Sequence, residues 1–170
     1  MSIQSFNITI DEWTNALHGY TWEDLTTKQS LTTWSLGQLY NHLMSETTYY
    51  IGRIDVCISS NRNANKEMTG EGKAMFLNNS FPDERLTGPP SNARVPQPTD
   101  KLGLITKFTG LKQTMNEKAL LMDKTSFHGK AKHPGLNYLN AAEWLQFADM
   151  HMRHHLKQKK RLEDYLSSSC

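Results

Sequence analysis

The chain has 170 residues, of which 37% are hydrophobic and 21% charged, and its formal net charge is +2. This length predicts a single domain over residues 1–170, and the composition excludes a disordered acidic or basic tail protein. Because 19 basic residues nearly balance 17 acidic ones, the charge gives no reason to expect nucleic acid or an anionic membrane as a partner.

The cysteines and the apolar segments predict where the protein works. Cys57 and the last residue, Cys170, form no framework of spaced pairs, which favours a reducing compartment. The N-terminus lacks the pattern of a signal peptide, and no window reaches the roughly 18 apolar residues of a membrane span. We therefore expect a soluble, cytoplasmic protein.

Two helices are predicted in the first third of the chain. The first covers roughly residues 4–20, although Ile8 to Ile10 would equally suit a strand. The second begins at Ser35, whose side chain can cap the first turn reciprocally with Gln38, and its apolar stripe continues to Ile58.

Residues 61–99 contain three glycines and five of the six prolines of the chain. No regular element can run through this segment, and we expect only one or two short helical turns within it. A connection of this length is typical of a crossover, a lid or a binding loop, and two adjacent helices that run in the same direction require one.

Two more helices are predicted in the last part of the chain. The third follows Asp100, a good N-cap residue, and ends near Lys124. After a turn region over residues 127–136, Asn140 and Glu143 form a capping-box-like start to the fourth. With no convincing strand, the sequence predicts an all-α four-helix bundle with a long crossover between helices two and three.

The fourth predicted helix carries two histidines one turn apart. His151 and His155 fall in its apolar stripe, whereas Arg153 and Lys157 fall on the opposite, polar side. Two buried imidazoles need partners, and an ion between residues i and i+4 satisfies both. The alternative is a pair of core histidines that bond to backbone or hydroxyl groups.

His42 is the candidate for a third ligand. It lies on the flank of the apolar stripe of the second helix, where its side chain could reach a neighbouring helix. Taken alone, a flanking histidine is more often a surface or hydrogen-bonded residue. Three protein ligands with one open position would nevertheless make a stable and reactive metal site.

Several short motifs occur in a characteristic order along the chain. They are Trp34-Ser35, His42, Gly135-Leu136, Glu143-Trp144-Leu145-x-Phe147 and His151-x-x-x-His155-x-x-Gln158. This arrangement resembles the DinB-like superfamily of bacterial damage-inducible and thiol-transferase-type proteins over nearly the whole chain. The resemblance implies an up-down-down-up four-helix bundle in which His42, His151 and His155 hold one divalent metal ion.

The remaining histidines are assigned ordinary roles. His18 suits the C-terminus of the first helix. His128 or His133 could approach the mouth of the site, but both are expected to be exposed loop residues. Glu46, one turn after His42, could orient a ligand or act as a base, but an intrahelical surface carboxylate is far commoner.

The resemblance suggests a metal-dependent enzyme for thiol transfer of the bacillithiol type or for small-molecule hydrolysis. Three neutral imidazoles permit this, because the ion keeps its charge and an open position. In the transfer reaction, the anionic tail of the thiol is expected near Arg85 or Arg94. The alternative is a non-catalytic stress-response or binding protein with a structural or adventitious metal.

The expected ion is zinc or nickel, although manganese and iron also accept imidazole. The expected partner is a small-molecule substrate, and homodimerisation through outer helix faces is compatible with a bundle. The basic residues from Arg153 to Arg161 are interpreted as a solvated helix face, so they do not predict nucleic-acid binding.

Overall fold

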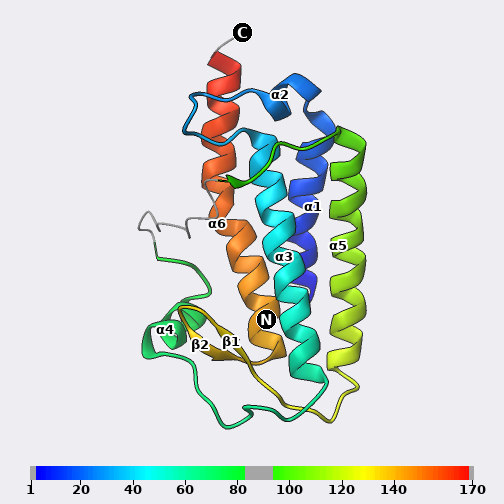
Figure 1. Ribbon diagram of the computed structural model, residues 1–170, viewed down its shortest axis with the longest axis vertical. Coiled ribbons are helices and arrows are strands. Elements are labelled where there is room, and N and C mark those ends of the chain that lie inside the picture. Colours follow the sequence, from blue (N-terminus) through cyan, green and yellow to red (C-terminus); the bar gives the residue numbers. More distant parts are fainter. Residues whose placement is uncertain (1–2, 83–93, 169–170) are drawn as a thin grey trace.

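The computed structural model describes residues 3–82 and 94–168, and within them the chain is mostly helical. Four long helices, α1, α3, α5 and α6, pack side by side along most of the molecule, while the shorter elements lie toward its ends (Figure 1). In chain order the elements are α1 (Ile3–Gly19), α2 (Trp22–Thr26), α3 (Leu36–Ile58), α4 (Gly70–Asn78), α5 (Lys101–Met122), β1 (Ala131–His133), β2 (Asn137–Leu139) and α6 (Ala141–Ser168).

Side-chain caps set the starts of the two helices that matter most for the site. At the start of α3, the Ser35 hydroxyl accepts a hydrogen bond from the Gln38 backbone N–H, and the Gln38 carboxamide accepts one from the Ser35 N–H. Asn140 and Glu143 make the same reciprocal pair before α6. Each pair satisfies two otherwise unpaired backbone donors, and both predicted starts are confirmed.

The long helices do not simply alternate in direction. In Figure 1, α3 and α5 both start at the end of the molecule where α2 lies, whereas α1 and α6 run toward that end. Because α3 and α5 are neighbours that run the same way, the chain between them must return along the molecule. That return carries the short helix α4, which agrees with the helical turn expected there.

Aromatic side chains link three of the long helices in the core. The ring of Tyr40 on α3 lies 5.2 Å from the ring of Trp13 on α1 and 5.0 Å from that of Phe108 on α5. All three side chains are buried, and the Tyr40 hydroxyl donates a hydrogen bond of 2.8 Å to the Trp13 carbonyl. The buried rings therefore have both the edge-on geometry and the polar partner that such rings favour.

The sequence analysis predicts no strand, and this prediction is wrong. β1 and β2 form a two-stranded antiparallel hairpin in which Ala131 pairs with Leu139 and His133 with Asn137. Asn137 has a φ of 64°, a conformation that asparagine tolerates better than most residues. Strands of three residues are too short for alternation to reveal them. The fold is mostly helical with a small hairpin, not purely helical.

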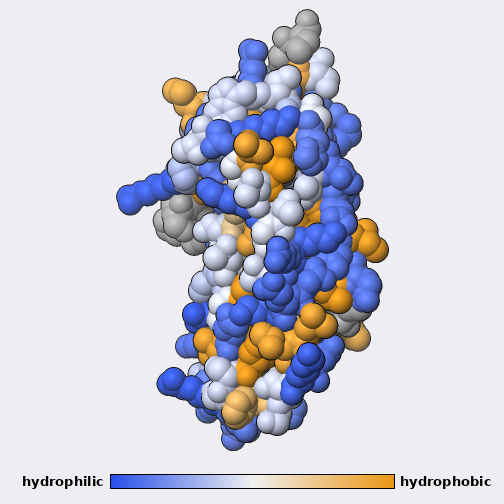
Figure 2. All heavy atoms as spheres, turned by 90° about the vertical axis from the view of Figure 1, so that its right-hand side faces the viewer, coloured by the Kyte–Doolittle hydropathy of each residue, from blue (hydrophilic) through white to orange (hydrophobic). Residues whose placement is uncertain are grey.

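The face along α1 and α5 carries a mixture of hydrophobic and hydrophilic residues (Figure 2). The exposed apolar side chains on these two helices include Ile8, Leu102 and Leu120. Within the described part of the chain, no helix combines the length and the apolar character that crossing a bilayer requires.

Candidate metal centre

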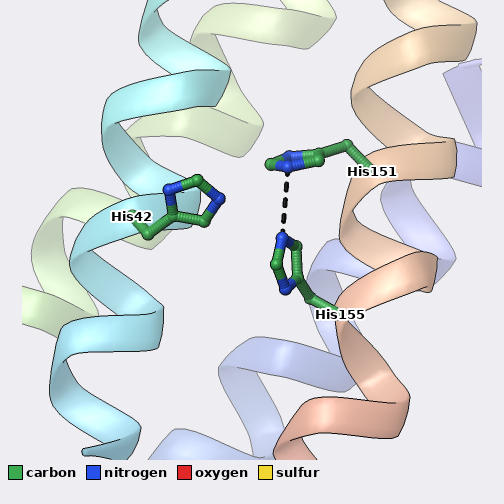
Figure 3. Close-up of side chains that lie close together, drawn as sticks. All are labelled: His42, His151 and His155. Atoms are coloured by element: carbon green, nitrogen blue, oxygen red, sulfur yellow. Dashed lines mark hydrogen bonds between the residues drawn. The ribbon is translucent and has the colours of Figure 1, made fainter. Parts of the chain in front are cut away.

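Two neighbouring helices bring three histidines together. His42 lies on α3, and His151 and His155 lie one turn apart on α6. Their rings point toward one another (Figure 3), and one ring nitrogen from each lies within 4.8 Å of those from the other two. The three candidate ligands from distant parts of the sequence therefore meet at one point.

His42 is the most buried of the three. Only 6% of its surface is exposed, and its ring lies 4.9 Å from the ring of Trp34 just before α3. Burial lowers the pKa of His42 to about 4, because a charged imidazolium loses its hydration inside the protein. At neutral pH the ring is therefore uncharged and has a lone pair available for a ligand.

His155 is oriented by a partner on its own helix. Its Nδ1 lies 2.9 Å from the side-chain oxygen of Gln158, and a carboxamide oxygen can only accept a hydrogen bond. Nδ1 therefore carries the proton, which leaves Nε2 with a lone pair directed toward His151. Burial is the main cause that lowers the pKa of His155 to about 4.

The contact between His151 and His155 fits a shared ion. Their Nε2 atoms are 3.2 Å apart, and a tetrahedral ion with metal–nitrogen distances of about 2.0–2.1 Å keeps its ligand nitrogens about 3.3 Å apart. Burial, followed by the neighbouring histidines, holds the pKa of His151 well below its ordinary value. Its buried Nδ1 has no hydrogen-bond partner among the described residues.

Three aromatic rings also lie close to His151. The ring of Tyr50 lies 5.7 Å from His151, that of Phe81 lies 6.1 Å away, and that of Phe147 lies 6.4 Å away in a parallel orientation. His154 contacts Phe81 and does not belong to the group of converging nitrogens. The surroundings of His151 therefore include apolar aromatic surface.

A cavity of about 890 Å³ lies along α3, α5 and residues 94–100. Among the three histidines only His42 contributes to its wall, together with Glu46 and Arg94. The Glu46 carboxylate accepts a hydrogen bond of 3.0 Å from Tyr50. Arg94 therefore lies on a cavity that borders the site, whereas Arg85 lies outside the described residues.

The other histidines separate into two groups. His18 and His128 are exposed, as expected. His133 is half-buried because it lies in β1, and its ring is 4.7 Å from that of Phe147. Its Nδ1 accepts hydrogen bonds from two backbone N–H groups of the hairpin turn, and burial lowers its pKa to about 4. The expectation of an exposed loop histidine is wrong for His133.

Sequence reasoning missed a buried ion pair beside the site. Asp149 is fully buried, and its Oδ2 accepts a hydrogen bond of 2.9 Å from Arg153 Nε, one turn later on α6. Arg153 is half-buried, so its placement on the polar side of the helix is wrong. The available signal was an acidic residue inside an apolar stretch with an arginine four positions later.

No protein family model matches the chain, and comparisons with curated proteins and with solved structures also give no match. The resemblance to the DinB-like superfamily therefore depends on the quoted motifs alone. Independently of that resemblance, the chain has a mostly helical fold and a cluster of three histidines that could hold a metal ion.

Proposed function

We propose that the protein is a metal-dependent enzyme of the DinB-like type that holds one divalent ion between His42, His151 and His155. The observation that carries the proposal is the convergence of three imidazole nitrogens within 4.8 Å of one another. Burial lowers the pKa of each ring, so all three are neutral at pH 7, as metal ligation requires.

The proposed fold is an up-down-down-up four-helix bundle formed by α1, α3, α5 and α6. It is supported by the packing of these helices against one another and by their directions in Figure 1. In such a bundle, side chains of facing helices build the cofactor site in the interior. The pairing of α3 with α6 across the histidines follows that plan.

The proposed ion is zinc or nickel, and manganese and iron are the alternatives that imidazole also accepts. Bound to three neutral histidines, it would supply an open position at which a thiol or water loses its proton more readily. The protein contributes the orientation of the ligands: Gln158 accepts the Nδ1 proton of His155 and so directs its Nε2 inward.

The proposed reaction is transfer of a low-molecular-weight thiol, of the bacillithiol type, to an electrophile, with small-molecule hydrolysis as the other branch. The cavity along α3 and α5 has room for such a small molecule. Arg94 on its wall offers a positive charge to an anionic tail. The proposed partner is therefore a small molecule and neither nucleic acid nor a membrane; a homodimer and a cytoplasmic location stay predictions.

Two measurements test this function. Protein purified without an affinity tag is analysed for metals beside a triple variant with His42→Ala, His151→Ala and His155→Ala, and we expect about one ion per chain only in the unchanged protein. The loaded protein is then mixed with several thiols and a generic electrophile, and with an ester, amide and lactone panel for the hydrolase branch.

The outcomes separate catalysis from a structural ion. We expect the loaded protein to accelerate one of these reactions, and the triple variant to keep its fold but lose the acceleration. No acceleration over metal-free protein in any assay contradicts the enzyme proposal. Loss of folding in the triple variant would instead assign the ion a structural role.

A further inference from the structure

A chain of polar contacts connects the buried Asp149 to the C-terminal end of α4. Arg153 donates from Nε to Asp149 and from one terminal nitrogen to the backbone oxygen of Asn79, at 2.9 Å in each case. Asn79 is the residue that ends α4, in a left-handed conformation with a φ of 51°. The planar guanidinium thus bridges Asp149 on its own helix to the end of α4, with a further hydrogen bond of 3.2 Å to the Asn79 side-chain oxygen.

A second side chain on α6 reinforces this junction. The Gln146 carboxamide nitrogen donates to the backbone oxygen of Phe76 at 2.9 Å and to the side-chain oxygen of Asn79 at 3.1 Å. Gln146 and Arg153 therefore hold the last turn of α4 from two points about two helical turns apart. Such directed contacts restrict where the chain can go immediately after Asn79.

The residue so placed is Phe81, two positions after Asn79. Its half-buried ring lies 5.1 Å from the ring of His154, 5.2 Å from that of Phe147 and 6.1 Å from that of His151. Phe81 therefore packs against α6 beside His151 and His154. It contacts the ring of one proposed ligand and adds an apolar surface beside the converging nitrogens.

We propose that Phe81 is the apolar wall of the metal site, that Arg153 positions this wall through Asn79, and that the site consequently favours ligands with an aromatic or other apolar group next to the metal-binding atom. The preference for apolar ligands, the ligand half of the inference, rests on the proposed function. The positional half concerns the folded chain alone and can be tested without any metal.

The positional half is tested by NMR of metal-free protein. The Phe81 ring shifts the imidazole proton signals of His151 and His154 by its ring current, so Phe81→Ala should move both sets. Arg153→Lys keeps the charge beside Asp149 but cannot make both forked contacts, and it should move the same signals in the same direction. Arg161→Lys, an exposed change on the same helix, and Phe127→Ala, an exposed change in a loop, serve as controls.

The ligand half is tested with cobalt-loaded protein, whose visible spectrum reports thiol binding. Phenylmethanethiol and 2-mercaptoethanol are titrated separately, and Phe81→Ala should weaken phenylmethanethiol about tenfold relative to 2-mercaptoethanol, because an aromatic contact and its buried area are lost. Arg153→Lys should reduce the same preference by a smaller factor.

Each result tests one part of the proposal. Unmoved histidine signals in Phe81→Ala overturn the wall, and signals that move in Phe81→Ala but not in Arg153→Lys overturn the positioning role. Equal weakening of both thiols overturns the ligand preference. A wild-type chain that takes up no cobalt overturns the proposed function and the ligand half with it, while the NMR comparison still decides the position of Phe81.

Discussion

Helix α6 buries polar groups on two faces, and these groups differ in how many hydrogen-bond partners they have. Toward α1, the Asp149 carboxylate accepts hydrogen bonds from Ser5 at 3.2 Å, Thr9 at 2.6 Å and Arg153 at 2.9 Å. Toward α3, the Nε2 atoms of His151 and His155 face each other at 3.2 Å, and His151 Nδ1 has no partner among the described residues.

This difference separates a structural polar group from a group that could hold a metal ion. A buried charge with a full set of partners contributes rigidity, and its removal damages the fold. On the second face, His151 can donate from Nε2 to His155 Nε2, but this bond leaves the buried His151 Nδ1 without a partner among the described residues. The first face therefore has its partners within the chain, whereas the second keeps a buried nitrogen with no partner in the described part of the chain, beside three converging imidazoles.

The largest expected effect lies on the complete face. Asp149→Ala leaves Arg153 Nε without its acceptor and removes the shorter of the two contacts of the Thr9 hydroxyl, and it should lower the free energy of unfolding by about 3–5 kcal/mol. Chemical denaturation of metal-free protein measures this. Asp164→Ala is the control: it removes the exposed carboxylate of the 2.6 Å pair with Lys160 on the same helix, and it should leave the free energy of unfolding nearly unchanged.

The next largest effect lies on the incomplete face. His151→Ala removes one of three proposed ligands and should weaken binding of zinc by two to three orders of magnitude, or about 3–4 kcal/mol. Competition with a chelating dye measures the affinity, and His128→Ala, a change of an exposed histidine outside the triad, provides the control. If metal-free His151→Ala unfolds as readily as Asp149→Ala, His151 is structural and the contrast between the faces is lost.

Acid should destabilise the metal-free protein through the same histidines. An unfolded histidine has a pKa of about 6.5, whereas burial lowers that of folded His42 to about 4. Between pH 6.5 and pH 4 the unfolded chain binds a proton at His42 that the folded chain does not bind. The free energy of unfolding is therefore highest above pH 6.5 and falls as the pH is lowered toward 4. For His42, which is only 6% exposed, we expect a loss of about 2 kcal/mol between pH 7 and pH 5.

Denaturation curves at several pH values check this expectation. His42→Phe removes the titrating ring but keeps an aromatic side chain in the buried position, so its stability should depend less steeply on pH over the same range. An unchanged slope in this variant would show that the loss arises elsewhere.

What the sequence could predict followed from local signals. Reciprocal caps at Ser35 and Asn140 marked the starts of α3 and α6 because both partners lie within one turn. The spacing of His151 and His155 placed both rings on one helix face for the same reason. His42 was less certain from its own helix, and the order of the quoted motifs selected it.

What the sequence could not predict depends on distant partners or on very short elements. Nothing near Asp149 indicates that Ser5 and Thr9, more than a hundred residues away, will complete its hydrogen bonds. The five-residue helix α2 has a capping box at Thr21 but is too short for an apolar stripe. The hairpin depends on Asn137 adopting a positive φ, which a turn-rich segment permits without requiring.

The smallest expected effect concerns His155, a proposed ligand whose outer nitrogen already has a partner. Gln158→Ala removes the acceptor of the 2.9 Å contact with His155 Nδ1, so the ring loses its fixed tautomer and zinc affinity should fall about tenfold. Gln158→Glu keeps an acceptor at this position and should restore the affinity, while Gln113→Ala, an exposed change on α5, controls for loss of a glutamine. Equal affinities for Gln158→Ala and the unchanged chain would mean that packing alone orients His155, and the incomplete face would then have no built-in support for an ion.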